Sequence, residues 1–227
     1  SHLSGRLGQR REISMAKGFA NPRETWDKRF STPDYIFGTA PNVWLATHAD
    51  LLKPGMRVLA VADGEGRNSV WMAQRGLMVD AFDISPVGVE KAQKLAASAG
   101  VDVNYQVCSV EDFTWKVGEY DAVVAIFIQF ADPDTRATLF KRMKSALKPD
   151  GLILLQGYTP KQLDYKTGGP PNLDHLYTEP LLQDAFGDLD IVELRSYEDV
   201  LDEGSQHSGP SAIVGLVARK PFGCNFS

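Results

Sequence analysis

The sequence predicts an α/β protein whose core is a doubly wound, mostly parallel sheet covered by helices on both faces. Three observations carry this prediction. Short apolar runs of strand length alternate with helical patterns, a glycine-rich turn follows the first run, and an acid, Asp83, ends the second. Such alternation is typical of right-handed βαβ crossovers around a parallel sheet.

The first two thirds of the chain supply the alternation. Strands are expected at 57–62, 78–83, 102–107, 121–127 and 151–157, and helices at 67–75, 86–99 and 134–147. Two of the helices begin with a cap residue followed by proline, Ser85 before Pro86 and Asp132 before Pro133. The Lys-Pro-Asp-Gly sequence at 148–151 ends the third helix and turns the chain into the fifth strand.

The last third changes character. A glycine- and proline-rich stretch at 159–173 is followed by a short helix around 179–186, and then by strands near 189–198 and 211–219. We expect an insertion, spanning 159–177, and then an antiparallel hairpin. The ends of the first, second and fourth strands should line one crevice, where ligands bind in open α/β sheets.

The glycine turn and the acid after it indicate a nucleotide site. Gly64 and Gly66 permit a tight turn against a ligand, and the helix that follows points its free amides at that ligand. Asp83, about 20 residues further on, has two oxygens that can accept from both hydroxyls of a ribose. The alternative, that Asp83 caps the helix at 86–99, is weaker because Ser85 is better placed. The pair favours an adenosine-containing cofactor.

Composition narrows the function. The net charge is −5, which argues against a polynucleotide partner, and 43% hydrophobic residues suffice for one sizeable core. We expect one domain over 21–221, after a disordered tail at 1–20. No apolar run approaches the roughly 20 residues of a membrane span, and no secretory signal is evident, so a cytoplasmic location is expected. The two cysteines lack disulfide or metal-ligand spacing, and no metal is expected.

Several motifs in this order resemble class I S-adenosylmethionine-dependent methyltransferases over residues 26–220. The glycine motif, acid-x-Gly-x-Gly-x-Gly in that family, reads Ala60-Val61-Ala62-Asp63-Gly64-Glu65-Gly66 here. Asp83 matches the ribose-binding acid and Ile84 the residue against adenine, while 120–124 and 147–152 match later motifs. The resemblance implies a Rossmann-like sheet of seven strands, S-adenosylmethionine as cofactor, and a small-molecule methyl acceptor.

A closer resemblance is to the tellurite-resistance and thiopurine methyltransferase branch, whose members alkylate sulfur and related soft atoms. It is carried by Trp26-Asp27-Lys28-Arg29-Phe30, by 37–42 and by 65–68. The 203–209 turn, with His207, fits the same branch, whereas Gln129 stands where a histidine is expected.

The residues expected to bind the cofactor come from the motifs and from an N-terminal lid at 21–52. Aromatic residues of the lid can either staple it to the sheet or face the sulfonium of the donor, and Arg29 can pair with the donor's carboxylate or lie on the surface beside Asp27. The full set is Trp26, Arg29, Ala62, Asp63, Gly64, Gly66, Asn68, Asp83, Ile84, Val110, Glu111 and Ile126.

Candidate acceptor-binding residues are Tyr35, Phe37, Gln129, His175 and His207. The two histidines are the ones placed to reach the rim of the pocket, and the alternative is that both are exposed loop residues. Gln129 is expected to orient the acceptor at the mouth of the pocket. No residue is assigned as catalytic. Lys91 and Lys94 are expected on a solvated helix face, and Cys108 in the core.

Methyl transfer from a sulfonium is an in-line displacement that needs alignment and little acid-base chemistry when the acceptor is already nucleophilic. The missing base therefore favours a thiol-like acceptor. Three alternatives stay open. In a nicotinamide-dependent reductase the dinucleotide fingerprint has Gly or Ala where Ser69 stands. A nucleic-acid methyltransferase is expected to carry an amine clamp or a Pro-Cys nucleophile after the fourth strand. A sensor would bind the donor without transferring its methyl group. A monomer or a homodimer is expected.

Overall fold

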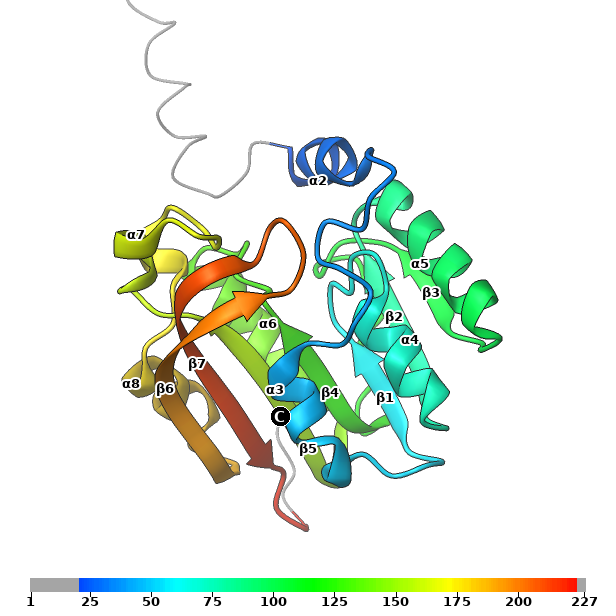
Figure 1. Ribbon diagram of the computed structural model, residues 1–227. Helices are drawn as coiled ribbons and strands as arrows, with labels where there is room; N and C mark the ends of the chain where they lie inside the picture. The colour runs from blue at the N-terminus through cyan, green and yellow to red at the C-terminus, as the bar shows by residue number, and fades with distance from the viewer. Residues whose placement is uncertain (1–20, 224–227) are drawn as a thin grey trace, which may run out of the picture.

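The computed structural model describes residues 21–223 and shows one seven-stranded sheet flanked by helices (Figure 1). The strand order is β3-β2-β1-β4-β5-β7-β6. Its strands are β1 (Arg57–Ala60), β2 (Met78–Asp83), β3 (Asn104–Val107), β4 (Tyr120–Ile126), β5 (Leu147–Tyr158), β6 (Asp190–Asp202) and β7 (Ser208–Arg219). The predicted fold class is confirmed; the expected tail at 1–20 lies outside the described residues.

The first five strands are parallel and the hairpin supplies the one antiparallel partner. β1 pairs with β2 and β4, β2 with β3, and β4 with β5, all in parallel register, whereas β7 runs antiparallel to both β5 and β6. The order in which successive strands are added to the sheet reverses between β1 and β4. The carboxyl ends of these two strands therefore flank the crevice where an open α/β sheet binds ligands.

The helices lie where the pattern predicted crossovers. The described helices are α2 (Pro22–Phe30), α3 (Val43–Thr47), α4 (Arg67–Gln74), α5 (Pro86–Ala99), α6 (Pro133–Ala146), α7 (Gln162–Tyr165) and α8 (Glu179–Phe186), with short 3-10 turns η1 (Ala49–Leu51) and η2 (Leu173–His175). Ser85 caps α5 by accepting from Gly88 N, and Asp132 caps α6 by accepting from Thr135 N, as expected.

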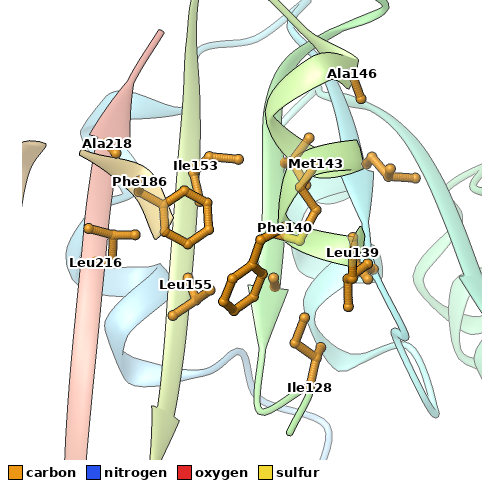
Figure 2. Close-up of a cluster of buried hydrophobic side chains, with 14 of the residues drawn as sticks. Ile128, Leu139, Phe140, Met143, Ala146, Ile153, Leu155, Phe186, Leu216 and Ala218 are labelled. Atoms are coloured by element: carbon orange, nitrogen blue, oxygen red, sulfur yellow. The ribbon is translucent and has the colours of Figure 1, made fainter. Parts of the chain in front are cut away.

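Two apolar clusters hold the helices on opposite faces of the sheet. One contains Phe140 and Met143 of α6 with Phe186 of α8, packed on β5 and β7 residues such as Leu155 (Figure 2). The other contains Trp44 of α3 and Met72 of α4 against β1 and β4. Both faces of the central strands are therefore buried, which explains why these strands read as continuous apolar runs.

Three boundaries differ from the prediction. β1 ends at Ala60 because Ala62, with φ of 49°, already turns into the glycine loop. β5 begins at Leu147, which pairs with Tyr120 before the register shifts, so the Lys-Pro-Asp-Gly turn is an irregularity within the strand. The terminal strands are longer than expected and carry the 203–207 turn away from the sheet, toward the loop after α2 (Figure 1).

No helix among residues 21–223 is both long and apolar enough to cross a bilayer.

Candidate active site

One cavity opens at the carboxyl ends of β1, β2 and β4. Its floor comes from these strand ends and the glycine loop, its roof from α2 and Phe37, and one side from the 203–207 turn. The lining residues are Pro22, Trp26, Phe30, Phe37, Ala60, Val61, Ala62, Asp63, Gly64, Arg67, Asn68, Phe82, Asp83, Ile84, Cys108, Ser109, Val110, Glu111, Val124, Ile126, Phe127, Phe130, Ala131, Asp132, Thr135 and His207. Most of the residues expected to bind the cofactor are among them.

The glycine loop bends through left-handed backbone at three positions, Ala62, Gly64 and Gly66. Asp63 N donates to Phe82 O at 3.0 Å, which ties the loop to β2. Gly66 does not reach the cavity; a Cβ there would lie 2.7 Å from the Cβ of Ala92, so this glycine lets α5 approach the start of α4. Ala62 stands where the family motif has a glycine, and its backbone adopts the left-handed conformation of the turn, with φ of 49°.

Asp83 lies at the end of β2 with both carboxylate oxygens already engaged once. Oδ1 accepts from Gly64 N at 3.1 Å, and Oδ2 accepts from Ser85 N at 3.0 Å. A carboxylate oxygen has two lone pairs, so each oxygen can still accept one more hydrogen bond from a ligand in the cavity. Burial raises the pKa of Asp83 to about 6 against the lowering effect of these two amides.

Asp63 holds the loop onto the next helix. Its carboxylate accepts from the amide and the hydroxyl of Ser69 in the first turn of α4. Burial raises the pKa of Asp63 to about 7, and the nearby charge of Asp83 adds to that rise. Ser69, which disfavoured a dinucleotide fingerprint, thus has a structural role in this loop.

Ile84, Val110 and Glu111, the residues expected near an adenine, line the same cavity as Asp83. Trp115 Nε1 donates to Val110 O at 2.9 Å and fixes this segment. Cys108 is half-buried: it packs against the core, as expected, and also lines the cavity.

A second group of lining residues is aromatic. Trp26 stacks on Phe30 with centroids 5.5 Å apart, and Phe37 stacks on His207 at 4.7 Å. The other face of His207 is covered by Phe127 at 4.2 Å. Two lid aromatics, Trp26 and Phe37, therefore do line the cavity as expected, while Tyr35 does not: its hydroxyl donates to Lys91 O, which fastens the lid to α5.

His207 is a buried, neutral ring rather than an exposed loop histidine. Burial, assisted by the charge of Arg67, lowers the pKa of His207 to about 3. Its Nδ1 is bonded to the hydroxyl of Tyr158, and burial raises the pKa of Tyr158. That hydroxyl keeps its proton and can donate to Nδ1, and an imidazole with so low a pKa is a weak base.

Gln129 and His175 lie behind the cavity wall instead of at its mouth. Gln129 accepts from Tyr158 N at 2.6 Å and donates to Tyr158 O at 2.8 Å and His175 O at 3.2 Å. The side chain of His175 is buried, and neither residue lines the cavity. Their expected contact with an acceptor is therefore wrong, because the loop after β4 turns Gln129 toward β5 to satisfy backbone groups.

Arg29 also fails to reach the cavity, and its guanidinium lies over the Trp26 ring at 4.9 Å. The cation that does line the cavity is Arg67, which the sequence analysis overlooked. Its Nη1 donates to Glu203 Oε1 at 2.6 Å, and both side chains are buried. The partners are 136 positions apart, so no local pattern could pair them.

Asn42 joins this ion pair to the rest of the site. Its Nδ2 donates to Glu203 Oε1 at 2.9 Å and to Gln156 Oε1 at 2.7 Å, and its N donates to Asn68 Oδ1 at 2.9 Å. Asn68, expected to face the cofactor, lines the cavity and shares in this network. The network locks together the N-terminal segment, α4 and the 203–207 turn.

Lys91, expected in solvent, is partly buried and holds the lid onto α5. It pairs with the Glu65 carboxylate of the glycine loop and donates to Phe30 O and Thr32 O. Lys94 is exposed on the outer face of α5, as expected. The difference arises because the loop after α2 folds over the first half of α5 and covers position 91.

Comparison with known proteins supports the reading of this cavity. Residues 58–151 match the methyltransferase domain family. A ubiquinone biosynthesis O-methyltransferase of Xanthomonas axonopodis pv. citri is 38% identical over 108 residues, which are 47% of this chain and 45% of that protein. The chain thus spans less than half of the length of this curated relative.

Two solved structures share the fold over most of their length. One comes from work on the conversion of a disulfide bond into a thioacetal group during echinomycin biosynthesis. It has a TM-score of 0.73 at 16% identity, and the match covers 90% of this chain and 94% of that protein's chain. The other is TehB from Haemophilus influenzae, with a TM-score of 0.64 at 17% identity, covering 87% and 66%. At these identities the likeness concerns the fold.

The match over residues 58–151 and the Rossmann-like sheet agree with each other, and both support the predicted methyltransferase class. The narrower assignment to the tellurite-resistance and thiopurine branch stays a prediction, because at 17% identity the likeness to TehB concerns the fold.

Proposed function

We propose that this chain transfers a methyl group from S-adenosylmethionine to a soft atom, foremost a thiol sulfur, of a small apolar acceptor. The observation that carries the proposal is that one cavity is lined both by Asp83 and by the rings of Phe37 and His207. We call the surroundings of Asp83 the nucleoside half and those of Phe37 and His207 the aromatic half. A donor in the first half would direct its methyl group toward an acceptor in the second.

In the nucleoside half, Asp83 would accept from the ribose hydroxyls through the two lone pairs that Gly64 and Ser85 leave open. Ile84, Val110 and Glu111 would flank the adenine, and the backbone of Ala62 to Gly64 would lie along the rest of the donor. These assignments rest on the cavity's lining and on the donor that the domain family uses.

Trp26, Phe30 and Phe37 of the lid form a cluster with centroids 5.5 to 6.2 Å apart, and all three line the cavity. Aromatic faces attract a cation without acting as nucleophiles, so they suit a sulfonium. They also exclude water, and an in-line displacement that consumes the sulfonium charge benefits from a dry site and from alignment.

His207 of the aromatic half is a poor base for deprotonating an alcohol, because burial lowers its pKa to about 3. Gln129 lies outside the cavity. A thiol with pKa near 8.5 is a few per cent thiolate at neutral pH without help, whereas an alcohol is not. A cytoplasmic location and a monomeric or dimeric state stay predictions.

The test is a panel of thiophenol, phenol and aniline with S-adenosylmethionine, following release of S-adenosylhomocysteine. Turnover on thiophenol well above phenol and aniline is expected. Turnover on phenol alone would contradict the soft-atom assignment and favour an oxygen acceptor, in line with the name of the Xanthomonas relative.

Calorimetry with S-adenosylhomocysteine, done beforehand, separates the remaining possibilities. No binding heat would contradict the methyltransferase proposal itself, and a parallel titration with NADH would then test the reductase alternative. Binding without release of product on any panel member would favour a donor-binding sensor.

A further inference from the structure

The cavity contains a cation whose hydrogen-bonding capacity is mostly unused. Arg67 lines the cavity and is 6% exposed, and its guanidinium makes one hydrogen bond to the described residues, from Nη1 to Glu203 Oε1. Nε and Nη2 bond to no described group, although a guanidinium carries five N–H donors. Neither nitrogen is fully enclosed and Arg67 lines the cavity, so both donors can be reached by a ligand that offers acceptor oxygens.

Glu203 does not saturate Arg67. The ion pair uses one carboxylate oxygen, Oε1, which also accepts from Asn42, and the second oxygen, Oε2, is enclosed and bonds to no described residue. The pair is therefore single-bonded and not the two-bond fork that a guanidinium prefers. Glu203 fixes the position of the guanidinium and leaves its other edge available.

Arg67 stands between the two halves of the cavity. Its charge acts on Asp63 in the glycine loop and also on His207 and Tyr158 at the aromatic end. Asp63 and His207 line the same cavity as Arg67. An anion held by Arg67 would thus be either the amino-acid end of the donor or an acid group of the acceptor.

We propose that Arg67, fixed by Glu203 and Asn42, is the carboxylate-binding residue of this cavity. The proposal rests on the proposed function, because the two carboxylates that can reach this position are the α-carboxylate of the donor and an acid group on the acceptor. A planar guanidinium with a free edge matches either one with two parallel N–H···O bonds.

The experiment compares wild type with R67Q using paired probes that differ in the carboxylate. For the donor the pair is S-adenosylhomocysteine and 5′-methylthioadenosine, which keeps the nucleoside and the thioether and lacks the amino-acid end. For the acceptor the pair is 4-mercaptobenzoate and thiophenol, titrated into protein saturated with S-adenosylhomocysteine. Affinities are measured by calorimetry, so the readout does not depend on turnover.

A selective loss supports the proposal and names the source. If R67Q binds S-adenosylhomocysteine about 10- to 100-fold more weakly and 5′-methylthioadenosine as wild type does, Arg67 holds the donor's carboxylate. If both nucleosides bind unchanged and 4-mercaptobenzoate alone is weakened, Arg67 holds an acid group of the acceptor. R67K, which keeps the charge without the fork, should recover part of the loss.

The proposal is overturned if neither carboxylated probe loses more affinity than its partner, including an equal loss for both members of a pair, which would mark Arg67 as purely structural. Because R67Q leaves Glu203 buried without its cation and can unfold the protein, R67Q/E203Q is measured alongside. R75Q, an arginine outside the cavity that stacks on Trp71, is the matched control. Failure of wild type to bind S-adenosylhomocysteine would instead count against the proposed function.

Discussion

Asp83 is the residue on which donor binding should depend most. Replacing it with asparagine keeps the size of the side chain, removes the charge, and puts an N–H₂ group against one of the two amides that now donate to it. Since hydrogen bonds to a charged acceptor contribute about 1.5–3 kcal/mol, D83N should bind S-adenosylhomocysteine roughly 10- to 100-fold more weakly.

The control is D80N, in the same strand, whose carboxylate bonds to Arg57 and Tyr120 and does not line the cavity. D80N should change stability and leave the donor's affinity as it is. Equal affinities of wild type and D83N would sink the ribose assignment.

The raised pKa of Asp83 gives donor binding a pH dependence of known sign. Only the ionised carboxylate can accept from both hydroxyls of a ribose, and the pKa in the free protein is about 6. Affinity should therefore be steady at pH 7–8 and fall by up to tenfold per pH unit below about 6. Calorimetry at pH 5 and pH 8 tests this, and in D83N the slope should shrink.

The same shift acts on stability in the opposite sense. A carboxyl group whose folded pKa lies above its unfolded value binds its proton more tightly when folded, so the free energy of unfolding falls as pH rises from about 4 through 6 or 7. Both Asp63 and Asp83 contribute in this direction. The two buried carboxyl groups of the ligand-free cavity therefore lower the free energy of unfolding at neutral pH relative to pH 4.

At the scale of elements, the contact between α4 and α5 depends on the missing side chain of Gly66. In G66A the new Cβ would lie 2.7 Å from Ala92 Cβ and 2.9 Å from its Cα, on a backbone with φ of 93°. G100A is the matched control, since Gly100 also has positive φ (69°) but nothing within 4 Å.

G100A should cost about 1 kcal/mol from backbone strain alone, and G66A about 2–4 kcal/mol because overpacking is added. Urea unfolding of both variants measures the difference. Similar losses would mean that α5 shifts to relieve the contact.

The lid is fastened to α5 by Lys91, which links the Glu65 carboxylate to backbone carbonyls of the 30–34 segment. In K91Q this link is lost and Glu65 stays buried without its cation, so the segment after α2 should loosen. We expect faster amide exchange over 30–37 and a weaker donor affinity.

K94Q, on the exposed face of the same helix, should change neither quantity. If exchange over 30–37 were equally slow in K91Q and wild type, the aromatic packing of Phe30 on Gly88 and Gly64 would be sufficient to hold the lid.

For the whole molecule, the parts that sequence patterns predicted are those with a local cause. The strand and helix order follows from the spacing of apolar residues, the caps from Ser85 and Asp132, and the nucleoside half from glycines and an acid at strand ends. These signals lie within a few residues of the feature that they predict.

The parts that were wrong or overlooked depend on contacts between distant segments. Lys91 is partly covered by a segment 57 to 61 positions away, and the partner of Arg67 is 136 positions away. Gln129 and His175 were placed at the pocket because their loops lie near it, but side-chain direction is decided by which backbone groups need a partner. The topology predicts which loops lie near the cavity, but it does not predict the direction in which a loop side chain points.

The hydrogen-bonded residues Asn42, Arg67 and Glu203 limit how the acceptor specificity of the protein can be changed by mutation. Each is buried and bonded to at least one of the others, so a change at any single position strands a polar group, and useful changes would have to arrive in combination. Phe37, Phe127 and Phe130 line the same space through apolar surface and carry no such penalty. Directed evolution toward new acceptors should therefore diversify the three phenylalanines and leave the polar triad untouched.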